Sequence, residues 1–185
     1  MGPGRICDFR FDSKRFIKYF DTLETTADKA EENDGPPDPR PLVNLAKRMA
    51  RLPECQRDKD LVDRPWNVIT QLPEFTVCEE CFDEIVWPEL DEEKAIPMMF
   101  NKALQRLPKA SCQLYSPKMR GIFRTAVDVD DYKLLASKAR ERKKAETAYK
   151  SNLETLKRQA SQGKINPQLA AMETRRVEEE WAKWA

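Results

Sequence analysis

The stretch from Asp131 to Ser161 contains neither proline nor glycine, so no residue within it interrupts a helix. Its hydrophobic residues recur at steps of three and four, which is the spacing of one face of an α-helix. Two charged residues, Arg142 and Glu146, fall on that same face. We therefore predict one long helix that packs well at its ends and poorly in its middle.

A second helix is predicted to follow the turn QGKINP. Asn166 is a good N-cap residue, Pro167 suits the first helical position, and hydrophobic residues then recur at helical spacing. Because the connection is short, the two helices should form an antiparallel αα-hairpin. Trp181 and Trp184 should either pack on the preceding helix or form an exposed patch that docks a partner, since tryptophan dominates interface hot spots.

The rest of the chain is predicted to form shorter elements. The chain has 5 glycines and 13 prolines, whereas a β-sandwich or an α/β enzyme needs more glycine for its tight turns and phosphate loops. This composition favours helices joined by proline-rich connections. Hydrophobic spacing predicts such helices over residues 12–33, 41–52, 95–108 and 116–128.

Residues 54–90 differ in character and are rich in proline, tryptophan and cysteine. Two β-prone runs within them, residues 66–70 and 75–77, are expected to pair as a small, loose hairpin. A short helix should follow Cys78 and end before Pro88, because the residue before a proline disfavours the helical conformation.

The predicted fold class is mainly α. Residues 1–128 are expected to form an irregular helical domain with a cysteine-rich loop and small hairpin region at its centre. Residues 129–185 are expected to form the antiparallel αα-hairpin. Charged residues make up 35% of the chain, which fits a thin core surrounded by long, solvated helices.

Histidine is absent from the chain, and its absence excludes several classes of site. Ser-His-Asp and Cys-His catalysis, Cys₂His₂ zinc fingers and HExxH metalloproteases all require it. The sequence also contains no Walker loop and no GxGxxG or GxSxG motif. We therefore expect a protein without enzymatic activity.

The cysteines provide the strongest local motif. Cys78 and Cys81 form a CxxC pair, which places two thiolates on one tight turn and supplies half of a zinc site. Cys55 and Cys112 lie on either side of the pair, each in a loop-like context near a proline. We predict that these four residues bind one structural Zn²⁺, with Cys7 as an alternative ligand.

Two other interpretations of the cysteines stay open. In the first, the CxxC pair is a thiol-disulfide redox motif, because a β-prone run precedes it and a helix is expected after it. Neighbouring acids such as Glu79 and Glu80 oppose this, because negative charge raises thiol pKa values. In the second interpretation, the cysteines are ordinary small hydrophobic residues in a core.

Charge is distributed unevenly along the chain. Residues 79–93 hold eight acids and no bases, whereas residues 133–158 hold nine bases and three acids. Both segments suit solvated helix faces, or could dock against each other. The basic helix could also bind nucleic acid. The residues expected at its centre are Arg140, Arg142, Lys143 and Lys144.

Residues 72–90 (LPEFTVCEECFDEIVWPEL) and 111–126 (SCQLYSPKMRGIFRTA) resemble a group of uncharacterised proteins from filamentous fungi. The resemblance covers the middle third of the chain and extends thinly into the following basic helix. It implies that Cys78, Cys81 and Cys112 belong to one module, and it implies no catalytic residue.

Together these patterns predict an intracellular scaffold that binds another protein and is stabilised by a Cys₄ zinc site. The alternatives are a nucleic-acid-binding protein and, less favoured, a thiol-disulfide redox protein. The chain has no apolar stretch of membrane-spanning length and no secretory signal at its start, so we expect a cytoplasmic or nuclear location without membrane association.

Overall fold

The computed structural model describes residues 15–184. Cys7 and the expected helix caps Asp12 and Ser13 lie outside these residues. The chain divides into two compact units, residues 1–54 and residues 55–185. This division does not coincide with the boundary expected after residue 128, because the long helix that follows packs on the sheet and on the preceding helix.

The first unit contains two helices, α1 (Phe16–Glu32) and α2 (Arg40–Arg51), which pack against each other. The proline-rich segment between them ends α1, as predicted. Arg15 donates hydrogen bonds to the carbonyl oxygens of Met49 and Leu52, each at 2.7 Å. The Met49 carbonyl also accepts from the N–H of Leu52, so Arg15 adds a second bond there and supplies a partner to the Leu52 carbonyl just past the end of α2.

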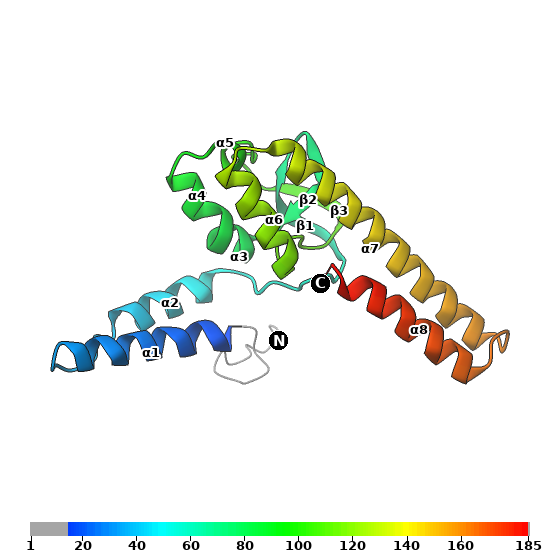
Figure 1. Cartoon of the computed structure of the whole chain (residues 1–185), viewed down its shortest axis with the longest axis horizontal. Coiled ribbons are helices and arrows are strands. Elements are labelled where there is room, and N and C mark those ends of the chain that lie inside the picture. The colour runs from blue at the N-terminus through cyan, green and yellow to red at the C-terminus, as the bar shows by residue number, and fades with distance from the viewer. Residues whose placement is uncertain (1–14, 185) are drawn as a thin grey trace. The chain divides into compact units, whose positions relative to one another are not determined.

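The second unit is built around a three-stranded antiparallel sheet in the order β2-β1-β3 (Figure 1). Strands β1 (Leu61–Ile69) and β2 (Leu72–Val77) form the predicted hairpin, with a β-bulge between Asn67 and Ile69. Strand β3 (Gln105–Ala110) pairs with the other edge of β1.

The helix predicted over residues 95–108 is wrong for most of its length. Only α5 (Ala95–Met98) is helical, and the segment after residue 104 is the edge strand β3. Pro108 fits this position because an edge strand needs fewer backbone donors. Pairing with β1, which lies some forty residues earlier in the sequence, overrides the local helical spacing.

The helix after Cys78 also continues further than predicted. It passes from α3 (Glu79–Cys81) through a π-helical turn, η1 (Phe82–Val86), into α4 (Trp87–Asp91). The wider π turn restarts the helix at Trp87, so Pro88 lies in a first turn, where its missing N–H is not needed.

Three longer helices complete the second unit. The predicted helix over residues 116–128 is present as α6, and the predicted αα-hairpin is formed by α7 and α8, which pack against each other. In the core, Phe75 of β2 stacks on Phe123 of α6, with ring centroids 6.0 Å apart. The bounds of these helices are Pro117–Asp128 for α6, Tyr132–Ser161 for α7 and Pro167–Ala182 for α8.

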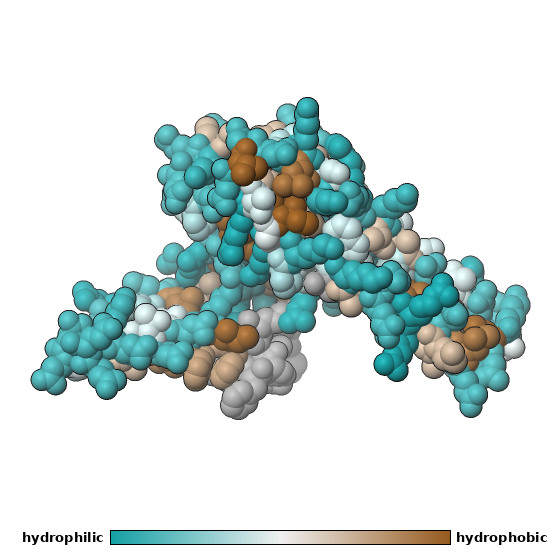
Figure 2. All heavy atoms as spheres, viewed as in Figure 1, coloured by the Kyte–Doolittle hydropathy of each residue, from teal (hydrophilic) through white to brown (hydrophobic). Residues whose placement is uncertain are grey.

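The surface of the chain is mostly hydrophilic on the face shown in Figure 2. Hydrophobic residues gather over part of the second unit and at the far end of the α7–α8 hairpin (Figure 2). Among residues 15–184, every helix is too short or too polar to cross a membrane.

Candidate metal centre

Four cysteine sulfurs converge in the second unit. Cys55 precedes β1, the CxxC pair joins β2 to α3, and Cys112 follows β3. Their Sγ atoms all lie within 4.8 Å of one another. A tetrahedral zinc ion with Zn–S bonds of about 2.3 Å needs sulfurs about 3.8 Å apart, so no pair of sulfurs would have to approach by more than about 1 Å. These four are the ligands predicted from the sequence, and together they could hold a metal ion.

Backbone N–H groups point at two of the sulfurs. Cys78 is the N-cap of α3, and its Sγ accepts a hydrogen bond from the N–H of Cys81 at 3.5 Å. The Sγ of Cys55 accepts one from the N–H of Arg57 at 3.4 Å. Such bonds favour the charged thiolate, which is the form that binds metal.

Hydrogen bonds between the cysteine segments hold the cluster together. The N–H of Cys55 donates to the carboxylate of Glu80 at 2.6 Å, which ties the first loop to the CxxC turn. The N–H of Cys112 donates to the carbonyl oxygen of Arg57 at 3.1 Å, which ties the third segment to the first. These hydrogen bonds therefore link the three cysteine-bearing segments to one another.

Burial and sulfur contacts act in opposite directions on the pKa of Cys55, whereas both raise the pKa of Cys112. Cys55, Cys81 and Cys112 are buried, and Cys78 is half-buried. Hydrogen bonds from Cys112 and from the CxxC pair lower the pKa of Cys55, whereas burial raises the pKa of Cys112. Four thiolates this close repel one another, so full deprotonation requires a cation between them.

Arg120 of α6 places a positive charge at the edge of the cluster. Its Nη2 atom lies 3.9 Å from the Sγ of Cys81 and 3.5 Å from the carboxylate of Glu84, and its Nε donates to the carbonyl oxygen of Leu114 at 2.7 Å. Four other bases lie near the cysteines in the sequence and could be expected to offset the charge of the thiolates: Arg57, Lys59, Lys109 and Lys118.

Two of those bases are engaged elsewhere. Lys109 pairs with Asp60 at 3.0 Å, and Lys118 lies over the ring of Trp184, 4.2 Å from its centroid. No sequence signal singled out Arg120, because its approach to Cys81 depends on how the turn between Cys112 and α6 folds.

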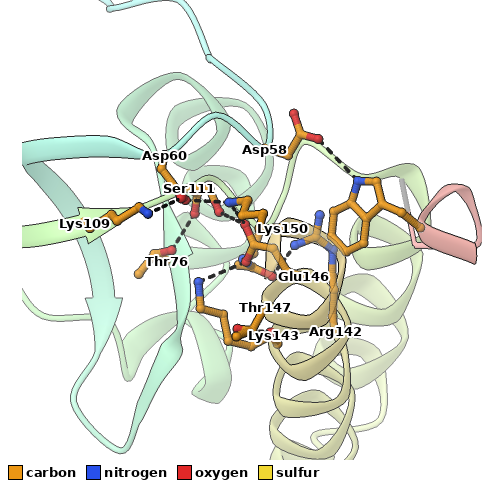
Figure 3. A network of polar contacts seen from close by, with 12 residues as sticks. Asp58, Asp60, Thr76, Lys109, Ser111, Arg142, Lys143, Glu146, Thr147 and Lys150 are labelled. Atoms are coloured by element: carbon orange, nitrogen blue, oxygen red, sulfur yellow. Dashed lines mark hydrogen bonds and ion pairs between the residues drawn. The ribbon is translucent and has the colours of Figure 1, made fainter. Parts of the chain in front are cut away.

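The middle of α7 carries a buried polar network, which Figure 3 shows. Ser111 donates a hydrogen bond to Glu146, and Lys143 and Lys150 contact the same carboxylate at 3.0 and 2.6 Å. Arg142 donates to the side-chain oxygen of Gln113. The prediction that this part of α7 packs poorly is therefore wrong, because its charged side chains meet partners on the cysteine-bearing loops.

This network engages two of the four residues that were predicted to contact nucleic acid, Arg142 and Lys143. Arg142 is fully buried, with its guanidinium 4.9 Å from the ring centroid of Trp181 and 5.1 Å from that of Tyr115, so it faces the interior. Lys143 pairs with Glu146. Of the four residues predicted to contact nucleic acid, Arg140 and Lys144 are exposed.

The C-terminal tryptophans pack on their own chain. Trp181 is buried, stacks on Tyr149 with ring centroids 5.2 Å apart, and donates from Nε1 to the carboxylate of Asp58 at 3.3 Å. Trp184 is half-buried under Lys118. Of the two arrangements expected for Trp181, the structure has the packed one.

The second unit lacks the parallel βαβ arrangement of a thioredoxin-like site, since its described strands pair antiparallel. Comparison of the chain with family models, curated proteins and solved structures gives no match. The resemblance of residues 72–90 and 111–126 to fungal proteins therefore stays a prediction, and functional inference rests on geometry.

Proposed function

We propose that this chain is a zinc-stabilised scaffold that binds another protein and has no enzymatic activity of its own. The convergence of four thiols from three separate segments carries the proposal. An all-sulfur tetrahedral site with no open position suits a structural ion. Such an ion would tie together three segments that lie far apart in the sequence.

Exposed hydrophobic side chains on the helices support the binding of a protein. Leu169 and Met172 of α8 are 48% and 68% exposed, and in the first unit Ile17 and Phe20 of α1 are 66% and 54% exposed. Large apolar residues grouped on an otherwise charged helix are typical of partner-binding faces.

Native mass spectrometry tests the metal. The full chain should carry one zinc ion, and the variant Cys112→Ser should lose it. The comparison variant is Cys7→Ser, because Cys7 is the alternative ligand predicted from the sequence. A bare polypeptide mass after purification in the presence of zinc would refute the metal centre, and zinc loss in Cys7→Ser would assign a different ligand set.

Cross-linking to binding partners tests the scaffold. The double variant Leu169→Glu/Met172→Glu adds two charges to the exposed apolar residues of α8. The control Gln168→Glu/Ala171→Glu adds the same charge to exposed, less hydrophobic positions on the same helix. A partner retained equally by both variants does not bind this face.

Nucleic-acid binding is the second candidate function. Lys133, Arg140 and Lys144 are exposed at steps of seven and four along α7, so they share one face. Affinity for generic RNA and DNA should then fall as salt rises, with a slope set by the number of phosphate contacts. Arg140→Glu/Lys144→Glu should abolish it, and absence of binding by the parent chain at low salt would exclude this candidate.

A further inference from the structure

The loops that carry the cysteines also supply the partners of the C-terminal hairpin. Asp58 and Asp60 follow Cys55 in the same loop, and Ser111 and Gln113 flank Cys112. Each of these four neighbours bonds to α7 or α8. Figure 3 shows Asp58, Asp60 and Ser111 in these positions.

The bonds come from both helices of the hairpin. Lys150 of α7 pairs with Asp60 at 2.5 Å, and Trp181 of α8 donates to Asp58 at 3.3 Å. Ser111, immediately before Cys112, donates to Glu146 of α7. The Cys55 loop thus contacts both helices, and the Cys112 segment contacts α7.

Two of the hairpin's charged groups depend on these bonds. Glu146 and Arg142 are fully buried. A buried charge that loses its partner destabilises a structure by about 3–5 kcal/mol, whereas a fully satisfied network specifies one arrangement. The bonds from Asp60, Ser111 and Gln113 to α7 form only when both cysteine loops hold these positions.

The two ends of α7 are held differently. Leu135 and Ala139 lie in the hydrophobic core of the second unit, so the first part of α7 is anchored by apolar contacts. From Arg142 onward, the described contacts between α7 and the cysteine-bearing loops are polar. A shift of these loops would therefore act on the outer part of α7 and on α8.

We propose that metal binding at Cys55, Cys78, Cys81 and Cys112 controls the docking of the hairpin, so that loss of the ion loosens α8 and exposes Trp181. This inference rests on the proposed metal centre. Coupling between two sites is reciprocal, so a docked hairpin must strengthen metal binding by the same factor by which metal strengthens docking. Couplings of this kind commonly lie at about 5–150-fold.

Hydrogen-deuterium exchange on the full chain tests whether metal binding strengthens the docking of the hairpin. Removal of zinc by a chelator should increase deuterium uptake in peptides from α8, residues 167–182. Peptides from α1 and α2 serve as an internal control, because these helices belong to the other compact unit. Their uptake should not change.

A substitution away from the cysteines tests whether a docked hairpin strengthens metal binding. Lys150→Gln removes the ion pairs with Asp60 and Glu146 without touching a cysteine. It should weaken zinc binding about 5-fold or more in competition with a chromophoric chelator. The control Lys157→Gln removes an exposed charge two turns further along α7 and should bind zinc like the parent.

The outcomes separate the coupling from the metal centre. If zinc binds but its removal leaves α8 exchange unchanged and Lys150→Gln binds it normally, the coupling is wrong and the metal centre stands. If the parent binds no zinc, both fail. If zinc removal also raises deuterium uptake in β2 and α6, the exchange result no longer reports on the hairpin alone, and the zinc affinity of Lys150→Gln decides the question. A reduced affinity would support the coupling, and an affinity equal to the parent's would overturn it.

Discussion

The Nη2 atom of Arg120 lies 3.9 Å from the Sγ atom of Cys81. Arg120 reaches this position from α6, where its Nε is fixed by the carbonyl oxygen of Leu114. A cation beside a sulfur offsets part of the net negative charge that four thiolates around one divalent ion would carry. The guanidinium therefore forms part of the candidate metal centre although it would not bind the ion.

Replacement of this cation should weaken metal binding. Arg120→Leu removes the charge and the hydrogen bond, and zinc affinity should fall about 10-fold, within the range seen for groups that support metal ligands. Competition with a chromophoric chelator at pH 7 gives the measurement. Arg124→Leu, on the next turn of α6 and exposed, is the matched control. Equal affinity in the two variants would remove Arg120 from the metal centre.

Removal of two arginines of α7, two positions apart, should change the stability of the fold to very different extents. Arg142→Ala takes away a fully buried side chain that contacts the rings of Tyr115 and Trp181, and the cavity that it leaves should lower the free energy of unfolding by about 3 kcal/mol. Arg140→Ala removes an exposed side chain and should change it by less than about 0.5 kcal/mol. Urea unfolding compares them, and a stability loss in Arg140→Ala as large as in Arg142→Ala would contradict the structure.

Sequence patterns identify the four cysteines and the αα-hairpin, but they do not identify the buried polar network around Arg142 and Glu146. Cys78 and Cys81 are recognisable because their spacing places both thiols on one turn, whatever the rest of the chain does. Arg142 and Glu146 look like defects in a hydrophobic face, because periodicity shows which residues share a face and not what lies opposite. Their partners lie about thirty residues earlier in the chain.

Strand β3 was missed for a related reason. Its residues, QRLPKA, alternate weakly and contain a proline, so no local signal distinguishes them from the end of a helix. Pairing with β1 provides the strand's backbone partners, and that pairing brings Cys112 toward Cys55. The four cysteines could be proposed as ligands from sequence, whereas the geometry that gathers them could not.

Glu146 should give the chain a distinct pH dependence. Burial raises the pKa of this carboxyl, but hydrogen bonds from Lys150 and Ser111 and the charge of Lys143 outweigh burial, so its pKa lies below the ordinary value of 4.5. A carboxyl with a lowered pKa in the folded state stabilises that state above about pH 4.5, and this contribution is lost as pH falls through the folded-state pKa.

The variant Glu146→Gln isolates this effect. At pH 7 it should be less stable than the parent by about 3 kcal/mol, because Lys150 and Lys143 lose a buried partner. The difference between the two proteins should shrink as pH falls below about 4.5, measured by urea unfolding at each pH. Glu141→Gln, at an exposed carboxyl paired with Lys138, should leave stability nearly unchanged. A difference that stays constant down to pH 3 would show that Glu146 is not ionised in the fold.

Replacement of two glycines of the second unit by alanine should change the stability of the fold in opposite directions. Gly163 follows α7 with φ +64°, and the N–H of Lys164 bonds to the carbonyl oxygen of Gln159 at 2.9 Å, which is the hydrogen bonding of a Schellman cap. Alanine is strained at this φ, so Gly163→Ala should destabilise the chain by about 1 kcal/mol. Gly121 lies within α6, and a Cβ atom there would meet no atom within 4 Å.

Gly121→Ala should therefore stabilise the chain by about 0.5–1 kcal/mol, because alanine loses less backbone entropy in a helix. Thermal unfolding of the zinc-saturated chain measures both variants, since neither site touches a cysteine. The loss of stability in Gly163→Ala should also appear as faster deuterium exchange at the α7–α8 turn, where the hydrogen bonds of the Schellman cap are made. Stabilisation by both substitutions would mean that residue 163 does not hold a positive φ, and that α7 ends in a different cap from the one described.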